Sequence, residues 1–169
     1  MRLGYDFYRR DVLEVAPDLL GKYIVRLSSE GMQTRWLITE TEAYRGEEDL
    51  ACHASKGRTV RTEMMYCSGG VLYIYLIYGM YWMMNVVTST ENNPQAVLIR
   101  GVEELDGPGK LTRKLGIDKT FNGEDLVKSG RIWVEASTLK PGYKATPRIG
   151  IEYAGEWKNK HWRYVISGK

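Results

Sequence analysis

Two glutamates one residue apart, Glu40 and Glu42, are the first candidates for chemistry in this sequence. They lie in a stretch that reads as a β-strand, and alternation along a strand places both carboxylates on the face of Trp36, Ile38 and Tyr44. A buried carboxylate is unfavourable unless it is paired or hydrogen-bonded, so the pattern indicates either a strand leaving the core for solvent or the mouth of a pocket. In a pocket, one carboxylate could activate water, and two carboxylates about 7 Å apart could form the acid and base of a glycosidase.

A second group of candidates is aromatic. Four tyrosines, Tyr73, Tyr75, Tyr78 and Tyr81, lie close together, and Tyr78 precedes Gly79, where the chain must reverse. A ladder of aromatic side chains across two strands could simply fill a core. A large aromatic residue at the tip of a turn is harder to bury, and a protruding tyrosine is suited to enter a stack of bases as a wedge.

The composition is that of a globular protein with a small positive charge. The chain has 169 residues, of which 43% are hydrophobic and 27% charged, enough for one domain with a real core. A net charge of +3 and a pI near 8.8 permit a polyanionic partner without requiring one. Two cysteines, Cys52 and Cys67, exclude a disulfide-rich scaffold and are expected to be reduced thiols, and two histidines are too few for a His-rich metal site. The N-terminus has no apolar signal core, and residues 71–87 are too short and too rich in tyrosine for a membrane helix, so we expect neither secretion nor a membrane.

The elements that must position these residues are mostly strands. Apolar spacing predicts a helix over residues 9–20, with Gly21 as its stop. Strands are expected at residues 22–27, 34–44, 71–77, 81–88, 96–103, 131–135, 148–151 and 162–166, a loop at 45–61 and a short helix starting at 110–115. Strands that outnumber helices and are joined by short turns favour an antiparallel or mixed curved sheet with helices at its edge.

Short blocks spread along the chain agree in order and spacing with one enzyme family. They are ETEAY at residues 40–44, EDLACH at 48–53, LYIYLIYGMY at 72–81, Met84-Asn85, VLIR at 97–100, GPGKL at 107–111, DKTF at 118–121, RIG at 148–150 and AGEW at 154–157. With these blocks the sequence resembles the alkyladenine (3-methyladenine) DNA glycosylase family in its short, bacterial-type form. It departs from the family at Val60, where many members have proline, and at Thr62 and Glu63, which bears on DNA contacts and lesion preference.

The resemblance implies both a fold and an activity. The fold is α+β, a single domain over residues 1–169 with a curved, mainly antiparallel, open barrel-like sheet, peripheral helices and a protruding β-hairpin. The activity is that of a monofunctional DNA repair enzyme, which needs no cofactor, metal or Schiff-base lysine. Such an enzyme flips damaged purines out of double-stranded DNA and hydrolyses the N-glycosidic bond with an activated water, leaving an abasic site. Alkylated purines are the expected substrates, with deaminated and etheno purines as further candidates.

The resemblance also implies the role of each site residue. Glu42 resembles the general base that activates water, and Arg100 the arginine beside that carboxylate and the nucleotide's phosphate. Tyr78 resembles the intercalating tyrosine. The residues expected to form the base pocket are Tyr44, His53, Tyr75 and Asn85. Two of these have plainer alternatives, because His53 could be a solvated loop residue and Asn85 could only bond a neighbouring backbone group.

The chemistry of an alkylated purine agrees with this assignment. Extrusion from the duplex costs a few kcal/mol, which a plug in the gap and stacking in the pocket offset. Stacking contributes about 1–3 kcal/mol per base, and a purine made cationic by alkylation gains a further ~0.5–2 kcal/mol over electron-rich rings. Because the cationic base is a good leaving group, one carboxylate suffices. We therefore expect Glu42 to act and Glu40 to be a solvated or hydrogen-bonded strand residue.

Partners and rival functions complete the expectations. The candidates for contact with the DNA backbone are Arg58, Arg61 and Lys110, each of which could also be a solvated surface charge. The protein is expected to act on double-stranded DNA as a monomer in the cytoplasm, associated with the nucleoid in a bacterium. The alternatives are a catalytically weak module of the same fold that binds DNA lesions, and a carbohydrate glycosidase using Glu40 and Glu42.

Overall fold

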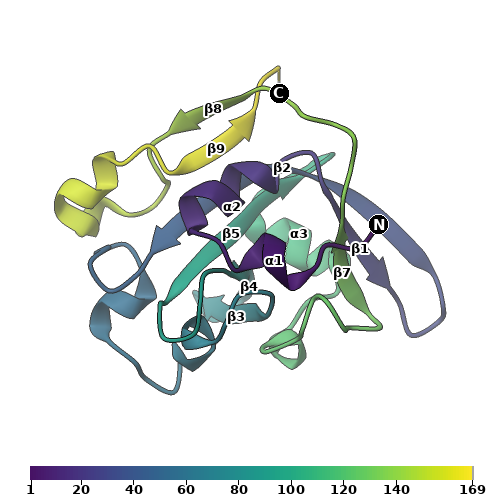
Figure 1. Ribbon diagram of the computed structural model, residues 1–169, viewed down its shortest axis with the longest axis horizontal. Coiled ribbons are helices and arrows are strands. Elements are labelled where there is room, and N and C mark those ends of the chain that lie inside the picture. The colour runs from purple at the N-terminus through teal and green to yellow at the C-terminus, as the bar shows by residue number, and fades with distance from the viewer. Residues whose placement is uncertain (169) are drawn as a thin grey trace.

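A single curved antiparallel sheet dominates the structure, a computed structural model that describes residues 1–168. Its strands are β1 (Tyr23–Leu27), β2 (Gln33–Arg45), β3 (Leu72–Ile77), β4 (Tyr81–Val87), β5 (Gln95–Val102), β6 (Leu105–Asp106), β7 (Ile132–Glu135), β8 (Tyr143–Thr146) and β9 (Arg163–Ile166). They pair in the order β3-β4-β5-β2-β1-β7, with β6 on β5, and β9 between β2 and β8 (Figure 1). The expected α+β class and mainly antiparallel curved sheet are confirmed, whereas the strand expected at residues 148–151 is wrong because that segment is irregular.

Few helices accompany the sheet. They are α1 (Tyr5–Tyr8), α2 (Val12–Asp18) and α3 (Pro108–Leu115), together with 3-10 segments at His53–Lys56, Glu63–Tyr66, Lys119–Phe121 and Glu152–Asn159. The helix expected at residues 9–20 begins later than predicted, because the Asp11 side chain accepts a hydrogen bond from the Leu13 N–H at 2.9 Å and caps α2. Helices α1 and α2 lie in front of the sheet in Figure 1.

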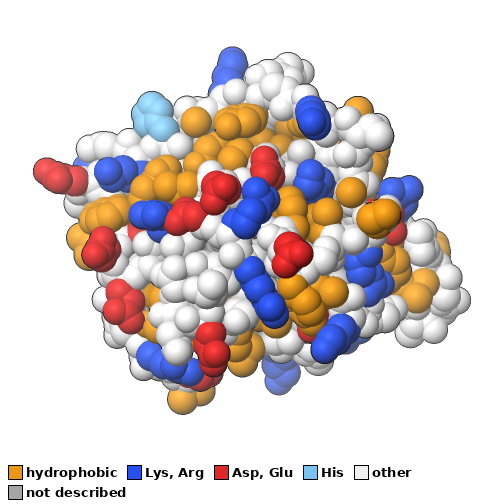
Figure 2. Space-filling view, in the orientation of Figure 1, with side chains coloured by type: hydrophobic (Ala, Val, Ile, Leu, Met, Phe, Trp, Pro, Cys, Tyr) orange, Lys and Arg blue, Asp and Glu red, His pale blue; other side chains and the backbone are white. Residues whose placement is uncertain are grey.

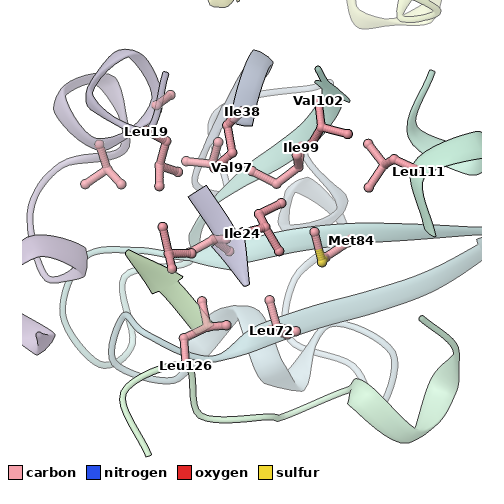
Figure 3. Packing of buried hydrophobic residues seen from close by; sticks show 14 of the residues in the cluster. Leu19, Ile24, Ile38, Leu72, Met84, Val97, Ile99, Val102, Leu111 and Leu126 are labelled. Carbon is pink, nitrogen blue, oxygen red and sulfur yellow. The ribbon is translucent and has the colours of Figure 1, made fainter. Parts of the chain in front are cut away.

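The main core fills the space between the helices and one face of the sheet. Leu19, which directly follows α2, converges there with Leu111 of α3 and inward side chains of β1 to β5 (Figure 3). On β5, Val97 and Ile99 pack into this core, so that Leu98 and Arg100 face the other side. The same alternation on β3 and β4 leaves the second face of the sheet free to form a site.

A register shift in β2 changes which side chains reach that second face. The pairing of β2 with β5 shifts between Ile38 and Thr41. Simple alternation predicts Ile38 and Ala43 on opposite faces, yet both pack into the main core. The irregular backbone between them offsets the alternation of side chains by one residue. The prediction that Trp36 and Ile38 share the face of Glu42 is therefore wrong.

The hairpin of β3 and β4 ends in a turn with an unusual backbone. The Met80 N–H donates to the Ile77 carbonyl oxygen at 3.1 Å, and between them Tyr78 and Gly79 have φ angles of 51° and 64°. Glycine adopts this left-handed conformation freely, but a bulky side chain rarely does. Since Tyr78 is 87% exposed, no burial explains its presence at this strained position.

The face that carries α1 and α2 has a mixed surface. Basic and acidic side chains are interspersed there with small apolar areas (Figure 2). Such a mixture gives little attraction for a polyanion. Within residues 1–168, no helix is long and apolar enough to cross a membrane.

Candidate active site

A cavity of about 380 Å³ opens on the face of the sheet opposite the main core. The outward side chains of β2 to β5 form its floor, and residues near positions 51–53 and 149–153 close its sides. The residues predicted to form a site come together in its lining, namely Tyr44, His53, Tyr75, Tyr78, Asn85 and Arg100. Its volume lies in the range of small-molecule binding sites.

Glu42 lies directly behind this lining and is fully buried. Its Oε1 accepts hydrogen bonds from the Tyr44 hydroxyl at 2.8 Å and from Arg100 Nη1 at 3.4 Å. Its Oε2 accepts one from the backbone N–H of Ile149 at 2.7 Å. All three donors belong to residues that line the cavity. A carboxylate has about four acceptor positions, so one remains for a further donor such as a water molecule.

The surroundings of Glu42 make it a stronger base than a solvated glutamate. Burial raises the pKa of the Glu42 carboxyl above its ordinary value, and the Arg100 guanidinium, the Ile149 amide and the Tyr44 hydroxyl oppose that rise. A carboxylate with a raised pKa accepts a proton more readily near neutral pH, which is the property a general base needs.

Arg100 connects Glu42 to a longer row of charges. Its Nε donates to Oε1 of Glu40 at 3.2 Å, and the same oxygen accepts a hydrogen bond from Arg163 Nε at 2.6 Å. Glu40 is buried, so its interpretation as a solvated residue is wrong and its interpretation as a hydrogen-bonded one is confirmed. Because Glu40 is held by two arginines and does not line the cavity, it supports Arg100 rather than facing a ligand.

Aromatic rings form the walls of the cavity. The ring of His53 lies 4.4 Å from that of Tyr75, centroid to centroid, and its Nδ1 is hydrogen-bonded to the Tyr73 hydroxyl at 2.9 Å. Burial lowers the pKa of His53 to about 4, helped by the nearby Arg61 and Lys56 cations. His53 is therefore neutral at physiological pH and is not the solvated loop residue considered above.

Asn85 contributes a polar group to an otherwise apolar strand. Its side chain is buried and lines the cavity, and its Nδ2 donates to the Tyr73 carbonyl oxygen at 3.2 Å. This bond to a neighbouring backbone is one of the two alternatives raised by the sequence. It fixes the orientation of the amide and leaves acceptor capacity on the side-chain oxygen.

The basic residues expected to contact DNA lie in different surroundings. Arg61 is exposed close to the cavity, with its guanidinium 5.6 Å from the centre of the Tyr75 ring. Arg58 forms a two-bond ion pair with Glu63, which neutralises much of its charge. Lys110 does not reach the cavity but lines an adjacent groove of about 750 Å³ between the hairpin and α3.

Sequence reasoning missed several features of this site. The backbone N–H of Ile149 donates a hydrogen bond to Glu42, but a backbone group leaves no signal in a sequence. Tyr73 orients His53, and its place among the clustered tyrosines was the available signal. Tyr153 lines the rim of the cavity and is 70% exposed. Within residues 1–168, no group of three or more His, Cys, Asp or Glu side chains could hold a metal ion.

The arrangement suits one kind of chemistry. A cavity with aromatic walls and a neutral imidazole favours a planar, cationic ligand. A buried carboxylate behind one wall can accept a proton from a water that attacks such a ligand or the sugar attached to it. The cavity therefore fits hydrolysis of a bond between a planar base and a sugar.

The chain matches one protein family over almost its whole length. The sequence profile described as Methylpurine-DNA glycosylase matches residues 6–106 and 104–169. A protein of Natranaerobius thermophilus that bears the name "Putative 3-methyladenine DNA glycosylase" is 42% identical over 98% of this chain and 96% of its own length. Proteins with the same name from Sodalis glossinidius and Methanocella arvoryzae are 46% and 44% identical over 96% of this chain. These matches cover 95% and 90% of their own lengths.

Proposed function

The chain belongs to the methylpurine-DNA glycosylase family, and on this premise we propose that it excises alkylated purines from double-stranded DNA by hydrolysing the N-glycosidic bond. One observation carries the proposal at the level of chemistry: a fully buried carboxylate, Glu42, is held directly behind an aromatic cavity by Tyr44, Arg100 and the Ile149 amide. The match to the family and to relatives of nearly equal length supports the same activity.

The cavity receives the damaged base after it has left the duplex. The rings of Tyr44, His53 and Tyr75 stack on it, which offsets part of the cost of unstacking. A neutral His53 does not repel a purine that carries a positive charge, whereas the electron-rich tyrosine faces attract it. Asn85 presents its side-chain oxygen to the edge of the base. Deaminated and etheno purines are flat enough to stack in the same way, although they lack the charge.

Glu42 activates the water that attacks the sugar. The carboxylate takes a proton from the water as the oxygen bonds to C1′, the bond from C1′ to the purine nitrogen breaks, and its electron pair stays on the base. Since an alkylated purine is cationic, it leaves as a neutral molecule without a general acid. Arg100, held by Glu40, keeps the carboxylate ionised and lies where the phosphate of the flipped nucleotide can approach.

Tyr78 fills the space that the base vacates. Its exposure at the tip of the hairpin and its strained backbone suit a side chain that acts outside the protein core. Arg61, beside the cavity, and Lys110, in the adjacent groove, are the better placed candidates for contacts with phosphates. Arg58, paired with Glu63, is the weaker one. We propose that the protein works on DNA as a monomer in the cytoplasm.

A base-release assay tests this function. The protein is incubated with duplexes containing 3-methyladenine, 7-methylguanine, hypoxanthine, ethenoadenine or no lesion, and in parallel with chromogenic glycosides. The proposal expects release of methylated purines, no cleavage of the glycosides, and binding that weakens steeply with salt because it rests on phosphate contacts. Tight, salt-sensitive binding without release of any base would instead indicate a lesion-binding module, and cleavage of a glycoside would indicate a carbohydrate enzyme.

A further inference from the structure

A buried ion pair lies beside the site, and neither of its residues lines the cavity. Asp49 and Arg148 are both fully buried. They form a two-bond pair, with Arg148 Nη1 at 2.6 Å from Asp49 Oδ2 and Nη2 at 2.9 Å from Oδ1. Burying two charges is costly, and an apolar pair of similar volume often serves stability as well or better. The pair therefore calls for an explanation beyond the stability of the fold.

The pair joins three segments that surround Glu42. Arg148 also donates to the Ala43 carbonyl oxygen of β2 at 2.9 Å and to the Trp157 carbonyl oxygen at 3.2 Å. Asp49 accepts hydrogen bonds from the backbone N–H of Arg45 at 3.0 Å and of Ala51 at 3.1 Å. The pair thus bonds to the backbone of β2 on both sides of Tyr44 and to the segment that leads to His53.

Both groups that the pair fixes are hydrogen-bond donors to Glu42. Ile149 follows Arg148 directly, and its N–H donates to Oε2 of Glu42. The guanidinium of Arg148 lies 4.9 Å from the centre of the Tyr44 ring, whose hydroxyl donates to Oε1. If the pair were loosened, both donors would be free to move away from the carboxylate.

We propose that Asp49 and Arg148 are positioning residues that hold the Ile149 amide and the Tyr44 hydroxyl against the two oxygens of Glu42. Neither touches the base or the sugar, and both act through Glu42. The inference rests on the proposed function, because it assigns to Glu42 the catalytic role given above.

The pKa of Glu42 distinguishes the positioning of its two donors from a direct effect of the charges of the pair. Within residues 1–168, five charged or titratable groups face Glu42: Arg100 from β5, Tyr44 from β2, Tyr75 from β3, Tyr153 from the 3-10 segment at Glu152–Asn159, and Arg148. The Arg148 cation lowers the pKa of Glu42. In Asp49→Asn the change of charge alone would lower the pKa of Glu42, whereas release of the Ile149 amide and the Tyr44 hydroxyl from the carboxylate would raise it. In Arg148→Met both effects raise the pKa, because the cation is lost and the two donors are released.

The experiment measures the full-length protein and these variants in two ways. Single-turnover excision of 7-methylguanine from a duplex is followed from pH 4 to 9, and the carboxyl ¹³C signal of Glu42, assigned with Glu42→Gln, is titrated by NMR. We expect a 10- to 100-fold loss of rate in both variants, because a misplacement of about 1 Å in a reacting group can cost on the order of 100-fold. We also expect the acid limb of the rate profile and the ¹³C midpoint to move up in both variants, because the Glu42 carboxylate loses hydrogen-bond donors in each.

Control variants make each outcome decisive. Arg131→Met and Glu124→Gln break an ion pair remote from the cavity and should change neither readout. Arg148→Lys covers the possibility that Arg148→Met does not fold. It keeps the positive charge but cannot form the two-bond pair with Asp49, so it should lower the rate 10- to 100-fold and move the acid limb up. A midpoint that does not rise in Asp49→Asn, or an Arg148→Lys rate equal to that of the parent, would overturn the inference. An inactive parent would overturn the proposed function instead, and the ¹³C titration would still decide whether the pair acts on Glu42.

Discussion

Tyr44 donates its hydroxyl hydrogen to Oε1 of Glu42 at 2.8 Å, from two residues further along the same face of β2. The same tyrosine lines the cavity, so a single side chain offers its ring to the proposed base and its hydroxyl to the carboxylate behind it. These two contributions can be separated, because phenylalanine keeps the ring and removes only the hydroxyl.

Tyr44→Phe should move the acid limb of the excision profile to higher pH. The Tyr44 hydroxyl lowers the pKa of Glu42, and a hydrogen bond to a charged group contributes about 1.5–3 kcal/mol, which corresponds to roughly one to two pH units. Above the limb the rate should fall much less. The measurement is single-turnover excision against pH. Tyr75→Phe serves as the matched control, since it removes a hydroxyl from the same cavity but not the one bonded to Glu42. An acid limb with the same midpoint in Tyr44→Phe and in the parent would show that the hydroxyl does not act on the carboxylate.

Glu42→Gln should be at least as stable as the parent at neutral pH. Burial raises the folded pKa of Glu42 above 4.5, so its contribution to the free energy of unfolding is most favourable below pH 4.5 and is lost as pH rises through the folded value. The glutamine is neutral throughout and can still accept the hydrogen bond from the Ile149 amide. Thermal melts at pH 4 and pH 8 check this. We expect the melting temperature of the variant, relative to that of the parent, to be higher at pH 8 than at pH 4. A relative melting temperature that falls on going to pH 8 would mean that the buried carboxylate stabilises the fold.

His53 should titrate near pH 4. Its folded pKa is lowered from 6.5 to about 4, so the unfolded chain binds more protons between these values. The stability due to neutral His53 is therefore complete above pH 6.5 and is lost as pH falls towards 4. The ring signals of the two histidines can be followed by NMR and assigned with His53→Gln. A midpoint for His53 at or above 6.5 would contradict the neutral pocket wall.

The positions of most strands could be predicted from alternating residues and turn signals. The side of the sheet to which each side chain points could not always be predicted. The segments that became β1 to β5 were expected within a few residues. The register shift between Ile38 and Thr41 was not, because it arises from pairing with β5 and leaves no local trace. The sequence pattern predicts a strand over residues 148–151, but the segment is irregular for a similar reason. Its conformation is set by the bonds of Arg148 to distant backbone groups.

The aromatic and polar side chains proposed to hold the base lie in the blocks of sequence that carry the family resemblance, whereas Tyr153 on the rim of the cavity lies outside them. The contacts that join the side chains of the site could not be predicted. That Glu40 is shared by Arg100 and Arg163 depends on the pairing of β2 with both β5 and β9, which brings distant parts of the chain together. Such pairing between distant segments is decided by the whole sheet rather than by the residues around each glutamate.

Replacement of Tyr78 should separate stability from function. Its left-handed backbone costs a residue with a side chain about 1–2 kcal/mol, which glycine avoids, and its exposed ring buries little. Tyr78→Gly should therefore melt no lower than the parent but excise more slowly from a matched duplex. The defect should shrink for a lesion in a mismatch or a single strand, where less stacking must be broken. Equal losses on all three substrates, measured in single turnovers with both Tyr78→Gly and Tyr78→Ala, would show that Tyr78 is a wall of the cavity rather than a wedge.

The most direct test of the mechanism compares Glu42→Gln with Glu40→Gln in single-turnover release of 7-methylguanine, with duplex binding measured for both. Glu42→Gln should bind the damaged duplex nearly as well as the parent but lose at least 10²- to 10⁴-fold in rate, because an amide cannot take a proton from water. Glu40→Gln should lose less, since it weakens the support of Arg100 and leaves the base in place. A Glu42→Gln variant that releases the base at near-parental rate, beside an inactive Glu40→Gln, would show that the wrong carboxylate has been assigned to the reaction.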